Sequence, residues 1–159
     1  MKFLLVLVAT VAYATAAPAC KGKISDGFCY FIGKMARGGA LVEQAESNCE
    51  QEGATLGQFR SLKAYSQVHD FLLASAPGTM ILTGMSYDQK LNKKVPLLAD
   101  GEPISYKPKW FEGHPIKENK HGEMVFMANR NDKFNGMMNA QDGSRYSVYL
   151  CEKKMKEDL

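Results

Sequence analysis

The chain has 159 residues, of which 45% are hydrophobic and 23% charged, and its formal net charge is +3. A chain of this length buries about two thirds of its unfolded surface, so we expect one globular domain that does not need a metal to fold. A net charge this small gives no argument for a nucleic-acid partner.

The N-terminal residues have the pattern of a secretory signal peptide. A lysine precedes an apolar run over residues 3–12, and Ala14 and Ala16 follow with the spacing of a cleavage site. We therefore expect residues 1–16 to be removed and residues 17–159 to form a secreted, extracellular domain. A membrane anchor is the alternative, but the apolar run is shorter than the ~20 residues that span a bilayer.

The four cysteines are Cys20, Cys29, Cys49 and Cys151. An even number in a secreted chain indicates disulfides, and four cysteines allow three connectivities. A bridge between the close pair Cys20 and Cys29 would staple an N-terminal hairpin and would leave Cys49 with Cys151. Neither a CxxC unit nor a Cys/His pair at zinc-finger spacing is present, so a structural zinc site is not expected.

After an aromatic run that indicates a strand, residues 38–53 have the periodicity of an amphipathic helix. Leu41, Ala45 and Cys49 recur every four residues, and Gly53 supplies a stop signal. The spacing predicts a helix that presents Cys49 to the core.

Residues 54–59 predict a short strand, and Ser61 is placed to cap a second helix with apolar residues along one face. This helix should end before residues 76–78, which read Ala-Pro-Gly. From Met80 onward, short apolar segments alternate with Gly, Pro, Asn and Asp, a pattern typical of strands joined by long loops. Helices first and strands afterwards favour an α+β architecture.

Six segments in this order resemble the C-type lectin-like domain family over essentially the whole predicted mature chain. They read CKGKISDGFCYFIG, VEQAESNCEQEGATLGQF, SQVHDFLL, LTGM, ADGEPISY and YLCEK. The resemblance implies an α+β C-type lectin-like fold, with two helices, small antiparallel sheets and a long loop region. It also favours the pairing of Cys20 with Cys29 and of Cys49 with Cys151.

In sugar-binding members of this family, the segments W-x-x-G-E-P-N and W-N-D supply oxygen ligands to calcium. Here the frame of Trp110, Gly113 and Pro115 is kept, but His114 and Ile116 occupy the two liganding positions. Calcium takes about six to eight oxygen ligands, and neither an imidazole nor a branched alkane replaces them. The resemblance therefore implies that the turn remains while the calcium site is lost.

The second calcium segment is altered too. Phe134, Asn135 and Gly136 match W-N-D, so the expected carboxylate is absent. On this alignment, the triple variant His114→Glu, Ile116→Asn and Gly136→Asp should regain calcium dependence.

The inner disulfide common in the family is also missing. Its two positions align with Met124 and with a residue near Asn139, and neither is a cysteine.

We take the polar and aromatic side chains around these positions as a candidate ligand-binding loop. They are Trp110, Glu112, His114, Glu123, Asp132 and Asn135. We expect no metal and no cofactor here, with a weak or displaced ion, or a transition metal at the loop histidines and glutamates, as the alternatives.

A candidate basic patch is formed by Lys90, Lys93 and Lys94. Its charge could attract anionic glycans, although a solvated face is the simpler interpretation.

No nucleophile elbow, HExxH or phosphate-binding loop is present, so we do not expect an enzyme. We expect a secreted recognition protein that binds an extracellular glycan, a microbial surface or another ligand without calcium, in innate defence. The alternative is an interaction protein in which the fold is a scaffold for protein partners, mineral or ice. The C-terminal KEDL differs from the KDEL retention signal in the order of its letters, which favours secretion over retention.

Overall fold

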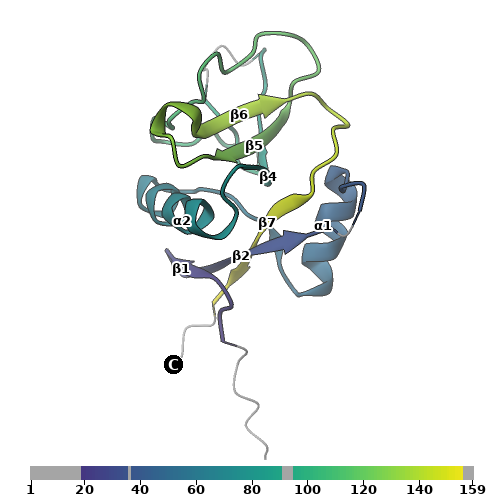
Figure 1. Ribbon diagram of the computed structural model, residues 1–159, viewed down its shortest axis with the longest axis vertical. Helices are drawn as coiled ribbons and strands as arrows, with labels where there is room; N and C mark the ends of the chain where they lie inside the picture. Colours follow the sequence, from purple (N-terminus) through teal and green to yellow (C-terminus); the bar gives the residue numbers. More distant parts are fainter. Residues whose placement is uncertain (1–18, 36, 91–94, 156–159) are drawn as a thin grey trace, which may run out of the picture.

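The computed structural model describes residues 19–35, 37–90 and 95–155, and the predicted signal peptide lies outside them. Two helices and a seven-stranded sheet form the fold (Figure 1). The helices are α1 (Val42–Gln51) and α2 (Leu62–Ser75), with a short 3-10 helix at Asp132–Phe134. The strands are β1 (Lys23–Ser25), β2 (Phe28–Lys34), β3 (Thr55–Leu56), β4 (Thr79–Ser86), β5 (Glu123–Ala128), β6 (Gly136–Ala140) and β7 (Val148–Lys154).

Both helices form where the sequence predicts them. The hydroxyl of Ser61 accepts a hydrogen bond from the Ala64 amide at 2.9 Å and so caps α2. At the start of α1, the Gln44 side chain accepts from the Leu41 amide at 3.1 Å. The α+β class and two-helix content are confirmed. In the described residues, neither helix is long and apolar enough to cross a membrane.

The sheet differs from the prediction in one respect. We predicted small antiparallel sheets, but the strands join in a single mixed sheet with the order β1-β2-β7-β4-β5-β6, and β3 also pairs with β7. The closing strand β7 runs parallel to β4 and antiparallel to β2 and β3. The C-terminal strand thus returns to the middle of the sheet, which no local pattern in the sequence indicates.

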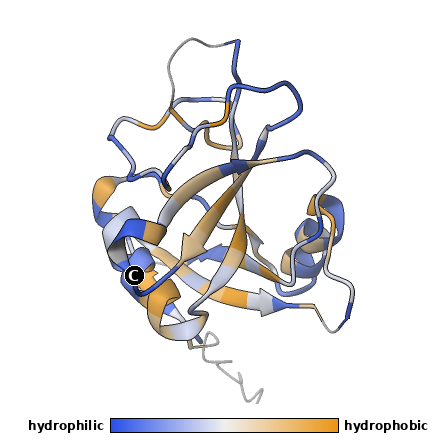
Figure 2. Ribbon diagram, turned by 45° about the horizontal axis from the view of Figure 1, so that its top comes forward, coloured by the Kyte–Doolittle hydropathy of each residue, from blue (hydrophilic) through white to orange (hydrophobic). Residues whose placement is uncertain are grey.

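The core has two halves because neighbouring residues of a strand point to opposite faces. Ile81 and Leu150 pack in the half that contains α2, whereas Leu82 and Cys151 pack in the half that contains α1. Figure 2 shows that the strands are mostly hydrophobic, whereas the loops beyond the sheet are largely hydrophilic. Burying a Leu or Ile side chain completely stabilises the folded state by roughly 1.5–3 kcal/mol relative to leaving it exposed.

Both disulfides confirm the expected pairing. Cys20 is bonded to Cys29, and Cys49 on α1 is bonded to Cys151 on β7. No free cysteine is present in the described residues. The second bridge joins residues 102 positions apart and fastens α1 to the central strand.

Candidate functional site

The predicted loop begins with a turn that lies along the edge strand β6. The Phe111 amide donates to the Met137 carbonyl at 2.9 Å, and the Met137 amide donates to the Lys109 carbonyl at 2.8 Å. Between these bonds, Trp110 is half-buried and packs edge to face on Tyr87, with ring centroids 5.8 Å apart. Trp110 therefore supports the loop from beneath.

The turn closes at Gly113, and the peptide bond between His114 and Pro115 is cis. Gly113 has a φ of 85°, a conformation that favours glycine. The His114 amide donates to the Phe111 carbonyl at 3.0 Å and completes the turn. The frame of Trp110, Gly113 and Pro115 thus builds an ordered turn.

One buried amide, that of Asn139, holds this turn against β6. Its Oδ1 accepts from the Ile116 amide at 2.7 Å and lies 3.0 Å from His114 Nδ1. Its Nδ2 donates to the carbonyls of Ile116 at 2.8 Å and His121 at 3.1 Å. These carbonyls fix the orientation of the amide, so Oδ1 can only accept, and Nδ1 of His114 carries the proton. His114 and Ile116, which align with the family's calcium-ligating positions, are thus hydrogen-bonded to Asn139.

Asn139 is the residue whose role the sequence reasoning missed. The β5–β6 register places it opposite Met124, so the two positions predicted for the missing disulfide do face each other. Both residues are fully buried. A thioether and an amide therefore replace the covalent link, and the amide ties the loop in place. The available signal was one polar residue among the apolar residues of the segment GMMNA.

Glu123 belongs to the structural support of a neighbouring loop. Its Oε2 accepts from the Tyr146 hydroxyl at 2.6 Å, and its Oε1 accepts from the Gly143 amide at 2.6 Å. Burial raises the pKa of Tyr146, and the hydrogen bond to Glu123 adds to the rise. The carboxylate thus braces residues 143–146.

The candidate residues Asn135 and Asp132 lie just before β6. Asn135 is buried, and its Nδ2 donates to the Asn129 carbonyl at 3.2 Å. Asp132 starts the 3-10 helix, but its side chain lies outside the described residues.

Gly136 lies close to the backbone of the turn. Its φ is 136°, and an added Cβ would lie 2.6 Å from the Lys109 carbonyl oxygen and 2.9 Å from the Phe111 nitrogen. Both atoms belong to the backbone that pairs with β6. The substitution Gly136→Asp therefore requires this backbone to shift, and the effect of the triple variant on calcium dependence stays a prediction.

The outer surface of the loop is aromatic. Phe134 is 40% exposed, and its ring lies 6.4 Å from that of Phe111, which in turn lies 5.9 Å from the His114 ring. At the edge, Lys133 lies 3.6 Å from the Glu112 carboxylate and 5.7 Å from the Phe134 ring centroid. An ion pair this exposed contributes little to stability. We call these five residues the aromatic loop face.

In the part of the chain that the structure describes, no group of three or more His, Cys, Asp or Glu side chains is placed to hold a metal. Calcium independence stays a prediction. Of the basic patch, Lys90 is exposed, with its amide donating to Asp88 at 2.8 Å, whereas Lys93 and Lys94 lie outside the described residues.

No protein-family model matches the chain, and no curated protein matches it in sequence. Solved structures do match. The carbohydrate-recognition domain of the mouse scavenger receptor C-type lectin has a TM-score of 0.61 at 17% identity, covering 87% of this chain and 97% of that one. Human lithostathine has a TM-score of 0.65 at 16% identity, covering 87% and 91%.

Herring type II antifreeze protein has a TM-score of 0.65 at 17% identity and covers 88% of this chain and all of that one. The three similarities extend over most of each chain, and each has a TM-score above 0.6. The chain therefore has the C-type lectin-like fold.

Proposed function

We propose that this protein is a secreted recognition protein that binds a glycan, on a microbial surface or another extracellular surface, through the aromatic loop face without calcium. One observation carries the proposal: the liganding positions of the turn are bonded to Asn139, while the exposed Phe134 ring lies 6.4 Å from the half-buried ring of Phe111. The two disulfides support an extracellular location, because such bonds persist in oxidising compartments.

The chemistry of the aromatic loop face suits a sugar. The C–H bonds on one face of a pyranose ring pack on an aromatic ring, and an apolar platform with a few polar groups is the usual composition of a small-ligand site. Glu112 and Lys133 supply an acceptor and donors for hydroxyl groups at the edge. Solved structures of the same fold include a cow CD23 domain in the presence of an oligosaccharide, which supports a glycan as the ligand class.

A binding role is preferred to catalysis. The structural neighbours are carbohydrate-recognition domains, antifreeze proteins and lithostathine, none of which is described as an enzyme by its name. The antifreeze neighbours support the alternative of a scaffold for another surface or a protein partner.

The test is an array of glycans and bacterial surfaces probed with calcium and with chelator. We expect the same binding in both conditions, and a loss of at least about tenfold in the Phe134→Ala variant, equal to about 1.4 kcal/mol. The matched control is Leu62→Ala, which removes an apolar side chain that is 57% exposed on α2, outside the aromatic loop face.

Calcium-dependent binding, or an equal loss in the Leu62→Ala variant, would contradict the proposal. In parallel, millimolar calcium should leave the melting temperature unchanged, because an ion far below its Kd does not stabilise the folded state. Binding to no array component in either condition would favour the interaction protein.

A further inference from the structure

Strand β2 has a free edge over its second half. Strand β7 pairs with β2 from Phe28 to Lys34, but β1 pairs only with residues 28–30. The Met35 amide donates to the Ser147 carbonyl, and the backbone groups of successive residues in a strand point alternately to its two sides. The odd-numbered residues therefore direct their N–H and C=O groups to β7. The N–H and C=O groups of Ile32 and Lys34 point to the opposite, unpaired side. Within the described residues, no strand pairs with β2 there. An edge of this kind is a template for another strand.

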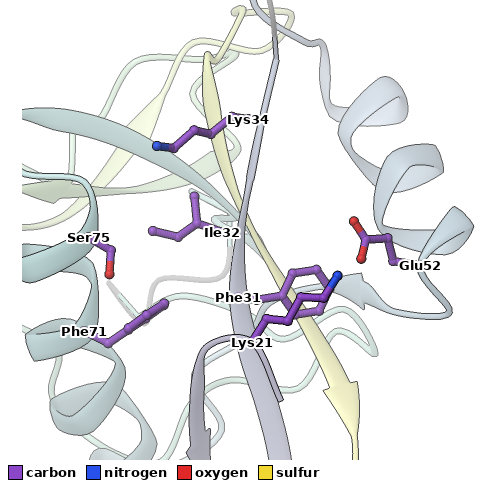
Figure 3. Close-up of a pocket in the computed structure, with 7 residues that line it drawn as sticks. All are labelled: Lys21, Phe31, Ile32, Lys34, Glu52, Phe71 and Ser75. Atoms are coloured by element: carbon purple, nitrogen blue, oxygen red, sulfur yellow. The ribbon is translucent and has the colours of Figure 1, made fainter. Parts of the chain in front are cut away.

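A hollow of about 280 Å³ lies on this edge (Figure 3). Phe31 and Ile32 both line it, although neighbouring residues of a strand point to opposite faces, so the hollow straddles the edge. Figure 3 shows Ile32 and Phe71 on the α2 side and Phe31 on the α1 side. The hollow thus offers an apolar surface on each face of a strand placed at its centre.

The charge of the hollow selects the partner. Lys34 and Lys21 lie near its two ends, and Glu52 is the one acidic side chain of the lining. Pairing with a second copy through this edge would bring the lysines of both copies into one short interface, and like charges across paired strands are destabilising. The volume is just below the 300–1,000 Å³ usual for small-molecule sites, and the free backbone groups suit a peptide better.

We propose that the free edge of β2 binds an extended acidic peptide of another protein, which adds to the sheet as a strand. Backbone groups of the peptide pair with those of Ile32 and Lys34. Its alternate side chains contact Phe31 on one face and Ile32 and Phe71 on the other. Acidic side chains near its ends meet Lys21 and Lys34. This site is separate from the aromatic loop face and does not depend on the proposed glycan.

The experiment uses the disulfide-bonded protein and two phage-displayed libraries of peptides about seven residues long, one with acidic residues fixed at both ends and one with lysines there. We expect enrichment from the acidic library alone. The Lys34→Glu variant should bind the selected peptides at least about tenfold more weakly. Lys154→Glu, an exposed lysine at the far end of β7, is the matched control, and Phe134→Ala should leave this binding unchanged.

Methylation of single peptide amides tests strand addition directly. Alternate amides of a strand point to opposite sides, so methylating those that face β2 should abolish binding, and methylating the others should not. Three outcomes would overturn the proposal: enrichment of neither library or of both, equal loss in Lys34→Glu and Lys154→Glu, or binding indifferent to which amide is methylated. A concentration-dependent dimer in sedimentation that Lys34→Glu disrupts would replace the peptide by a second copy.

Discussion

The buried amide of Asn139 shows how one residue converts a ligand loop into a fixed one. It makes hydrogen bonds with both backbone groups of Ile116, with the His121 carbonyl and with the His114 ring. The sequence could predict the turn, because Trp110, Gly113 and Pro115 act through local geometry. It could not predict the hydrogen bonds between Asn139 and the turn, which depend on the pairing of β5 with β6.

The substitution Asn139→Ala should destabilise the protein by at least about 2 kcal/mol, because each buried polar group left without a partner costs about 1–3 kcal/mol. Urea unfolding measures the change. Asn119→Ala removes an exposed asparagine from the same loop and should change the free energy of unfolding by less than about 0.5 kcal/mol. Equal effects of the two substitutions would show that the hydrogen bonds of Asn139 contribute nothing to stability.

At the scale of elements, α2 is linked to the β1–β2 turn through its cap. The Ser61 hydroxyl donates to the Asp26 carboxylate while it accepts from Ala64, and Lys63 lies 3.1 Å from the same carboxylate. The hydrogen bond from Ser61, then that from Lys63, lowers the pKa of Asp26. The sequence predicted the cap, because Ser61 precedes apolar residues spaced as on one face of a helix. It did not predict the contact with Asp26, which lies 35 positions away.

The substitution Ser61→Ala should cost about 1 kcal/mol at neutral pH. Since the pKa of Asp26 is depressed in the folded state, its contribution is present above the unfolded pKa and is lost as the pH falls through the folded one. The variant should therefore lose less stability on acidification than the wild type, measured by thermal unfolding from neutral pH downward. Ser66→Ala, an exposed serine within α2, serves as the control and should keep the wild-type acid profile.

At the scale of the whole molecule, the buried Tyr65 and the half-buried Tyr106 join separate parts of the core. Tyr65 of α2 contacts the rings of Phe59, Tyr106 and Phe126, and Tyr106 donates to the Phe59 carbonyl at 2.8 Å. Burial raises the pKa of Tyr65 to about 12, and it raises that of Tyr106 as well. The sequence predicted an apolar face on this helix, but local patterns could not predict a strand order that pairs segments distant in the sequence.

This packing predicts cooperative alkaline unfolding. A raised pKa means that the folded state retains the proton, so the stability is intact below about pH 10, the unfolded value, and is lost as the pH rises towards 12. Circular dichroism and tyrosinate absorbance should change together. Tyr65→Phe cannot ionise there and should unfold at higher pH. Gradual titration of Tyr65 without loss of structure would contradict the buried arrangement.

The position of the C-terminal strand also determines how the molecule can be tethered. The Met155 amide donates to the Gly27 carbonyl at 2.8 Å, which places this end of β7 at the β1–β2 turn. Figure 1 shows that end at the bottom, with β5, β6 and the adjoining loops at the top. A linker attached after Met155 would therefore orient every copy on a sensor surface with the aromatic loop face towards the solution.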